Sequence, residues 1–314
     1  MSSPISDLTY RGYQGGLAPD KSRWQVIFRQ ALRMALKKRA YWILMVLSGA
    51  HYLIFIAVSY FIDSFAGNMG GEQLKEQFFN RIIWRDQFLQ GFQLGHFLLM
   101  SIALLVGAGA IANDNRSKAL LVYLSKPCSK RDYLIGKWMG MFVPIAMALA
   151  IPATIFYFYG AMNYREFGFL TDDPWLYPKV IGAIGLASAF QSSVILGISS
   201  LFDQGRLAGA AYAGAYVLTG IFAGIAQTIA ANQKLPESVM PWVDRLHYLS
   251  LYGGIEGIYK TVLQTDGSFS FRDRGESFLV PRPELWLLAV VVILPVTGLL
   301  WAAWRKVRAV EVVG

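Results

Sequence analysis

Cysteine is almost absent from this chain, and clusters of catalytic or metal-binding side chains are absent. Cys128 is the only cysteine in 314 residues, which excludes an intrachain disulfide and any CxxC metal or redox site. His51, His96 and His247 are isolated in the sequence and form no HExxH-type ligand set, so we interpret them as packing or interface histidines. No catalytic carboxylate pair or Ser/His pairing is visible, which disfavours an enzyme.

A phosphate-binding loop for ATP is also missing. The pattern G-x-x-x-x-G-K-[ST], whose backbone amides surround nucleotide phosphates, does not occur. We therefore expect no ATP hydrolysis by this chain alone, and no cofactor or metal on it.

Charged residues are scarce, and apolar residues dominate. The chain is 55% hydrophobic and 16% charged, with a mean hydropathy of +0.40, which is too apolar for a soluble domain of this length. A membrane-crossing helix needs roughly 20 mostly apolar residues. The fold class predicted is an all-α polytopic membrane protein with six crossing helices, over residues 41–62, 88–112, 138–160, 176–202, 207–231 and 285–304.

The centres of these six stretches hold almost no Asp, Glu, Lys or Arg. Carriers driven by protons or ions place such groups at the membrane midplane, where they are costly and therefore functional. Their scarcity indicates that the energy source lies elsewhere.

The basic residues are distributed asymmetrically along the chain. Placing both termini in the cytoplasm puts 18 of the 29 Lys and Arg residues there, together with 6 of the 20 acidic residues. Short Lys/Arg-rich loops are retained on the cytoplasmic side during insertion. The net charge of +9 thus reflects membrane topology rather than nucleic-acid binding, and we expect a multi-pass protein of the plasma (inner) membrane.

The first 40 residues divide into two parts. Residues 1–21 are rich in Gly, Ser and Pro and are predicted to form a flexible cytoplasmic arm. Residues 22–40 place apolar side chains at helical spacing and basic ones mainly elsewhere, which predicts an amphipathic helix in the headgroup plane. The apolar set is Trp24, Ile27, Phe28, Ala31, Leu32, Ala35 and Leu36. Residues 41–314 then form the six-span domain.

The polar stretch 113–137 separates the second and third spans. Its basic residues predict a cytoplasmic location. Ala119, Leu120, Tyr123 and Leu124 recur at helical spacing, Pro127 ends that short helix, and Ser129 with Asp132 forms a capping-box pattern for the next. From the residues alone, an ordinary basic loop is an equally good interpretation.

This stretch resembles the loop between the second and third spans of ABC-2 type permeases, the membrane subunits of one class of ABC exporters. Asp114 stands where that family usually has Glu, Pro127 and Arg131 fit its turn, and Gly136-Lys137 fit the start of its third span. Ser117-Lys118 replaces the family's frequent Gly-Thr. The helix at 22–40 is similar to the family's interfacial "elbow" helix.

The resemblance implies a function and partners. The chain would be the permease subunit of an ATP-driven exporter, pairing with a second permease copy or homologue and embedded in membrane lipid. A separate ABC ATP-binding subunit would carry ATP and Mg and would dock on the loop 113–137. The implied coupling residues are Asp114, Ala119, Leu120, Tyr123, Leu124, Pro127 and Arg131. The alternative is an ATP-independent channel or small-solute carrier.

Polar and small residues mark the later spans. Gln191, Ser192 and Ser193 near the middle of the fourth span either line a substrate path or hydrogen-bond a neighbouring helix. Small residues in the fifth span predict close helix packing or a dimer contact, at Gly209, Gly214, Gly220 and Gly224. The exterior segment 232–283 contains an apolar part too short to cross the membrane. Within it, a solvated face is the favoured interpretation of Glu256, with a translocation path as the alternative.

Overall fold

The computed structural model describes residues 23–69, 71–119, 129–232, 236, 238–267 and 280–307, and these residues form helices without a strand. Within them, five helices are long and apolar enough to span a membrane. They are α5 (Trp84–Gly107), α8 (Lys130–Asn163), α9 (Leu176–Leu201), α10 (Gly205–Asn232) and α13 (Leu285–Lys306). A sixth candidate is the bent pair α2 (Arg39–Ser48) and α3 (Ala50–Met69). The prediction of an all-α membrane protein is confirmed, and the six predicted spans correspond to these five helices and the bent pair. The predicted arm 1–21 lies outside the described residues.

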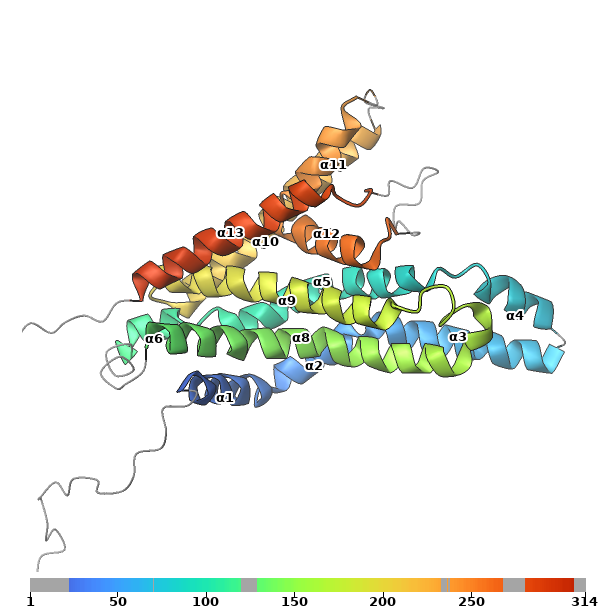
Figure 1. The fold of residues 1–314 in the computed structure, drawn as a ribbon, viewed down its shortest axis with the longest axis horizontal. Helices are drawn as coiled ribbons and strands as arrows, with labels where there is room; N and C mark the ends of the chain where they lie inside the picture. The colour runs from blue at the N-terminus through green and yellow to red at the C-terminus, as the bar shows by residue number, and fades with distance from the viewer. Residues whose placement is uncertain are drawn as a thin grey trace, which may run out of the picture.

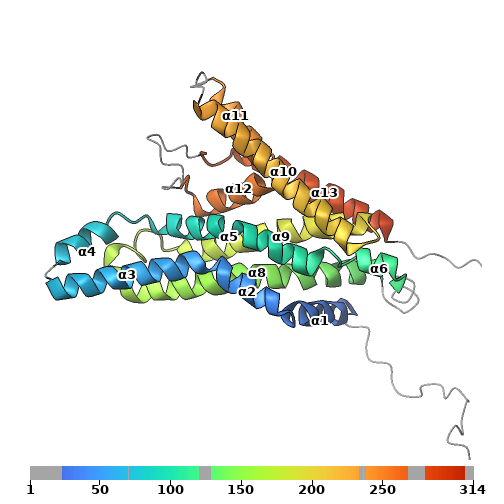
Figure 2. The ribbon, with the colours of Figure 1, turned by 180° about the vertical axis from the view of Figure 1, so that it is seen from behind.

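The spans form two groups of helices whose axes diverge, and we call the angle between the two groups the wedge. Helices α3, α5, α8 and α9 run side by side along the long axis, whereas α10 and α13 diverge from them (Figures 1 and 2). The short helix α12 (Leu251–Leu263) occupies the wedge, and α11 (Met240–Tyr248) lies beside the far end of α10. The described part of the segment 232–283 therefore packs against the spans.

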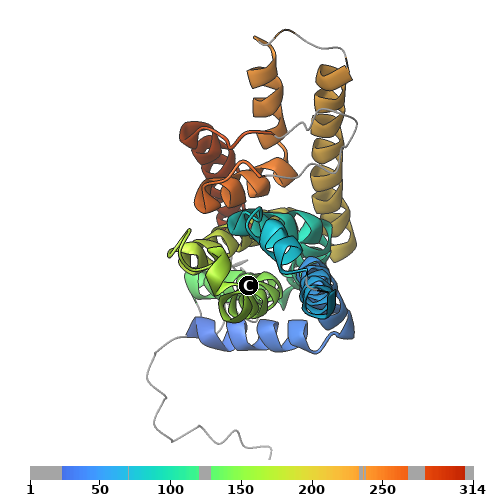
Figure 3. The same cartoon turned by 90° about the vertical axis from the view of Figure 1, so that its right-hand side faces the viewer.

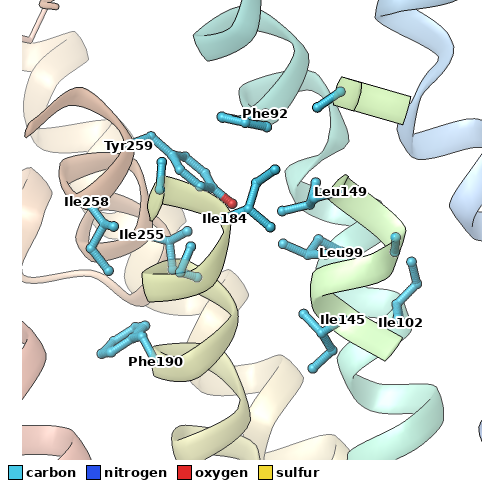
Figure 4. Close-up of a cluster of buried hydrophobic side chains, with 14 of the residues drawn as sticks. Phe92, Leu99, Ile102, Ile145, Leu149, Ile184, Phe190, Ile255, Ile258 and Tyr259 are labelled. Atoms are coloured by element: carbon cyan, nitrogen blue, oxygen red, sulfur yellow. The ribbon is translucent and has the colours of Figure 1, made fainter. Parts of the chain in front are cut away.

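The core lies where α5, α8, α9 and α12 meet. Figure 4 shows side chains from these helices pointing toward one another, including Phe92, Leu99, Leu149, Ile184 and Tyr259, and all five are buried. The apolar window of α9 is 67% buried, compared with 17% for α10 and 11% for α13. Thus α9 is the central helix, and α10 and α13 present most of their surface outward.

The first span is not one straight helix, as the stretch 41–62 suggested, because it bends by 46° between α2 and α3. A side chain at Gly49, the residue between these helices, would meet Cβ of Pro152 on α8 at 2.6 Å. Pro152 has no N–H, so the carbonyl of Ala148 loses its helical partner. The Ser48 hydroxyl lies 3.1 Å from that carbonyl and 2.7 Å from the carbonyl of Met45, so its single proton is shared between the two. The break between α2 and α3 therefore packs against Pro152 of α8. Helix α8 itself stays continuous through Pro144 and Pro152.

The predicted elbow helix is α1 (Arg23–Leu36), which runs across the bundle axis rather than along it (Figure 3). It packs on α8, where the missing side chains of Gly136 and Gly140 leave room for Ile27 and Ala31. Small residues allow such close approach of helix backbones. The outward side of α1 exposes Arg29, Gln30 and Arg33 together with Val26 (71%) and Met34 (49%), and such a mixture of basic and apolar residues is typical of a helix at a membrane surface.

Three short elements complete the described chain. They are α4 (Glu72–Phe79) between the first two spans, α6 (Ala112–Arg116) after α5, and a 3-10 turn at Arg165–Phe167 between α8 and α9.

Candidate functional site

A buried ion pair ties the start of the 113–137 stretch to the third span. The Asp114 carboxylate lies 2.7 Å from Nζ of Lys137 and accepts a hydrogen bond of 2.7 Å from the Tyr133 hydroxyl. Tyr133 is fully buried on α8, one turn before Lys137. We call these three residues the Asp114 network. Their contacts fix α6 against α8 at the point where the loop leaves the bundle.

The fourth span supports the same corner. The chain leaves its helical path between α5 and α6, so backbone amides there need other partners. The hydroxyl of Ser199 on α9 accepts from the amides of Ile111 and Ala112, both at 3.1 Å, and donates to the carbonyl of Ala108 at 2.9 Å. Ser199 thereby joins α9 to this corner through a single side chain.

The turn between the fourth and fifth spans is held by two asparagines of α6. Asn115 donates to the carbonyl of Phe202 at 3.2 Å, and the side-chain oxygen of Asn113 accepts from the amide of Gly205 at 3.3 Å. Movement of α6 would therefore reach α8, α9 and the start of α10 directly.

The predicted coupling residues fall partly within the described chain. Ala119 is half-buried, and Arg131 lines an apolar groove of about 610 Å³ between α8, α9 and α13. Leu120, Tyr123, Leu124 and Pro127 lie outside the described residues. The predicted capping box is confirmed, since Ser129 and Asp132 exchange side-chain and backbone hydrogen bonds at the start of α8.

The polar residues of the fourth span point to different neighbours. Gln191 donates to the Tyr212 hydroxyl on α10 at 2.9 Å, and Ser193 accepts from the Trp138 indole on α8 at 2.9 Å. Ser192 is buried, and its hydroxyl has no partner among the described residues. Two of the three residues thus hydrogen-bond a neighbouring helix. A path role for Gln191, Ser192 and Ser193 stays a prediction.

Glu256 does not lie on a solvated face, so the favoured interpretation of this residue was wrong. Its carboxylate on α12 accepts from Gln93 of α5 at 2.8 Å, and lies 2.9 Å from Nζ of Lys260 and 2.9 Å from Nε2 of His247 on α11. We call Gln93, His247, Glu256 and Lys260 the Glu256 network. Burial alone would raise the pKa of Glu256, but the His247 hydrogen bond and the Lys260 charge outweigh it and hold that pKa well below its ordinary value.

Polar aromatic residues surround this network. The ring of His96 on α5 stacks on Tyr252 of α12 with centroids 4.4 Å apart, and it meets Tyr216 of α10 edge-on at 5.6 Å. Within the described chain, both ring nitrogens of His96 and the hydroxyls of Tyr216 and Tyr259 are buried without hydrogen-bond partners. Buried polar atoms are normally satisfied, so these atoms have free capacity to hydrogen-bond water or another polar group.

Sequence reasoning missed this arrangement. His96 and Glu256 are 160 positions apart, and α12 brings them together by folding back into the wedge. The one available signal was Glu256 itself, a carboxylate within an apolar, glycine-rich stretch. In the described regions, no three His, Cys, Asp or Glu residues are grouped to hold a metal ion.

The glycines of α10 have unequal surroundings. A side chain at Gly209 would contact Ala108 at 3.3 Å, and one at Gly220 would reach Tyr252 at 3.8 Å. At Gly214 and Gly224, a Cβ atom would have no described atom within 4 Å outside its own helix. The first pair packs within this chain, and the second pair is free to meet another molecule.

Comparison with known proteins identifies the family. A family model described as ABC-2 family transporter protein matches residues 25–305, which is most of the chain. The match extends from α1 to the last span, and it confirms the family to which the sequence was found similar. No curated protein matches the chain.

Proposed function

Because the chain belongs to the ABC-2 family of transporter membrane proteins, we propose that it is the permease subunit of an ATP-driven exporter. Permeases of this family are transport subunits that lack ATPase domains. A separate ATP-binding subunit, with ATP and Mg, would therefore supply the energy. Two permease subunits, identical or homologous, would form the substrate pathway between them.

The coupling element of this proposal is the loop 113–137. The observation that carries it is the Asp114 network, which joins the first residues of the loop to α8 by an ion pair and a hydrogen bond. An ATPase that pushes on the loop would move α6, and the contacts of Ser199, Asn113 and Asn115 would pass the movement to α9 and α10.

We place this chain's share of the substrate path at the contact of α9 and α10, because α10 is also the helix that would meet the second subunit. Gln191 contacts Tyr212, whose ring lies 6.1 Å from that of Tyr216, and Tyr216 meets His96. This row of polar groups continues to the Glu256 network. It offers hydrogen bonds without a free charge, which suits passage of a polar group better than permanent binding.

The first test is copurification of the tagged full-length chain from its native membrane. We expect a nucleotide-binding protein in stoichiometric amount, ATPase activity in the complex, and no hydrolysis by the isolated chain. Hydrolysis by the isolated chain after contaminants are removed would contradict the division of labour. Transport without any such partner would favour the ATP-independent carrier.

The second test changes the loop itself. If the apolar face of the predicted helix before Pro127 sits in a groove of the ATPase, Leu120→Glu with Leu124→Glu removes two buried leucines. Burying one leucine is worth roughly 1.5–3 kcal/mol, so binding should weaken at least about tenfold. The matched control is Leu121→Glu with Ser125→Glu on the opposite face, which should keep the ATPase bound. A binding loss that is equal in both pairs, or absent from both, refutes this docking mode.

The third test concerns orientation, because both termini and the loop should be cytoplasmic. Cys128 is the only cysteine, so a membrane-impermeant thiol reagent reports on one position. We expect labelling in inverted vesicles and none in intact cells. Labelling of intact cells would reverse the topology and remove the loop from the ATPase side.

The fourth test concerns dimer formation through α10. A Cβ atom at Gly214 or Gly224 meets no neighbouring atom of the described chain, so cysteine at these positions should fold normally. In a Cys128→Ser background we expect Gly214→Cys or Gly224→Cys to cross-link two copies in membranes. The control is Val290→Cys on the exposed side of α13. Cross-linking confined to the control position would move the dimer contact away from α10.

A further inference from the structure

A polar pocket lies between the elbow helix and the Asp114 network. Its volume is about 830 Å³, and its walls come from α1, the end of α5, α6, α8 and the start of α10. Lys38, Arg116 and Arg206 line it from three separate segments of the chain. Segments distant in sequence therefore bring three cations to one cavity.

Within the described chain, these three cations lack carboxylate partners. Asp114, which also lines the pocket, is already paired with Lys137 at 2.7 Å. Among the described residues, no ion pair involves Lys38, Arg116 or Arg206, and the Lys38 ammonium donates to the carbonyl of Leu105, at 2.6 Å. Partial burial lowers the pKa of Lys38, as expected for an ammonium removed from water without a counter-charge. The described walls thus carry an excess of positive charge.

Part of the remaining wall is apolar, alongside polar side chains such as Asn113 and Gln204. Met34, Leu105, Val106 and Met141 line the pocket beside the cations. Helix α1 runs across the bundle axis (Figure 3), and its outward side exposes Arg29 and Arg33 together with Val26. A basic and apolar outward side suits the headgroup layer of a membrane, so we place the neighbouring pocket at that level. A ligand for this site needs an anionic head and an apolar body.

We propose that this pocket binds an anionic phospholipid of the leaflet in which α1 lies. The phosphate sits among Lys38, Arg116 and Arg206, and the first part of an acyl chain lies along Met34 and Leu105. Basic pockets between helices recognise anionic headgroups in this way. Such a lipid contacts α1, α6 and the start of α10 together, which joins the elbow helix to the Asp114 corner. The site does not depend on the identity of the transported substrate or on the ATPase.

The test measures lipid retention by the purified full-length chain. In neutral detergent, native mass spectrometry compares binding of phosphatidylglycerol and phosphatidylcholine added in equal amounts. We expect preference for phosphatidylglycerol. Lys38→Gln with Arg206→Gln should lower that preference about fivefold for each cation, corresponding to about 1 kcal/mol each. Binding of phosphatidylcholine should not change.

A matched control removes two positive charges next to the pocket but outside it. Arg29→Gln with Arg33→Gln changes two exposed cations of α1 that do not line the pocket, and it should leave the preference intact. Equal loss in both pairs, or no loss in the pocket pair, overturns the proposal. If the pocket pair does not fold, Arg206→Gln alone replaces it, since that residue is exposed in the first turn of α10.

Two further measurements distinguish the lipid from a free anion and from the ATPase as the ligand of this pocket. Full displacement of phosphatidylglycerol by millimolar inorganic phosphate identifies a free-anion site and overturns the lipid assignment. A pocket pair that loses its ATPase while keeping phosphatidylglycerol assigns the cations to the protein partner, which also overturns it. Retention of the ATPase with loss of the lipid supports the proposal.

Discussion

The Asp114 network and the Glu256 network both bridge helices through a carboxylate, but they differ in burial. The side chains of Asp114 and Lys137 are 18% and 10% exposed, and those of Glu256 and Lys260 are 6% and 3% exposed. The cost of separating charges rises with burial, because water no longer screens them. The Glu256 network therefore fixes α12 in the wedge, whereas the Asp114 network can rearrange at lower cost. A low cost of rearrangement suits a corner that must transmit movement.

The two networks also differ in how far apart in the sequence the joined residues lie. Asp114 joins two residues of α8 that are 19 and 23 positions away, while Gln93 and Glu256 are 163 positions apart. The first network closes a local corner. The second holds together parts of the bundle that no nearby sequence links.

The largest expected effect comes from removing the deeply buried carboxylate. Glu256→Ala leaves the Lys260 ammonium buried without its counter-charge, so we expect a loss of about 3–5 kcal/mol in unfolding free energy. Unfolding of the purified chain in detergent measures this loss. Glu256→Ala with Lys260→Met removes both charges and should recover part of it. A single variant as stable as the wild type would show that the network does not hold α12.

A smaller effect is expected at the coupling corner. Asp114→Asn still accepts the Tyr133 hydrogen bond but loses the attraction of Lys137, so the stability loss should be about 1–3 kcal/mol. Stimulation of the partner ATPase by substrate should also fall, by more than the loss of folded protein explains. Asp203→Asn, an exposed carboxylate in the adjacent turn, is the control and should change neither property. Equal effects of the two substitutions would remove the special role of Asp114.

The smallest effect is expected for an exposed ion pair. Arg245 of α11 lies 3.0 Å from Glu284, and these side chains are 33% and 53% exposed. Exposed pairs are screened by water and salt and contribute little. Glu284→Gln should therefore leave the thermal unfolding midpoint unchanged at both low and high salt. A clear shift at low salt would show that burial does not set the order of the two networks and this ion pair.

Local sequence patterns were sufficient to predict the main helices of this fold. The apolar stretches, the amphipathic segment 22–40 and the Ser129–Asp132 capping box depend on neighbours within one or two helical turns, and the structure places helices there. The bend at Gly49 was not predictable, because the residue that Gly49 packs against, Pro152, lies 103 positions away on another span.

The candidate site was likewise predictable only in part from the sequence. An all-helical membrane protein, its family resemblance and the basic loop at 113–137 were predictable from residue order, because composition and periodicity are properties of contiguous residues. The packed bundle was needed to learn that Asp114 pairs with Lys137, that Glu256 is buried, and that three distant cations share a pocket. Those contacts depend on how helices cross, and crossing is set by small residues and prolines that meet across long separations in sequence.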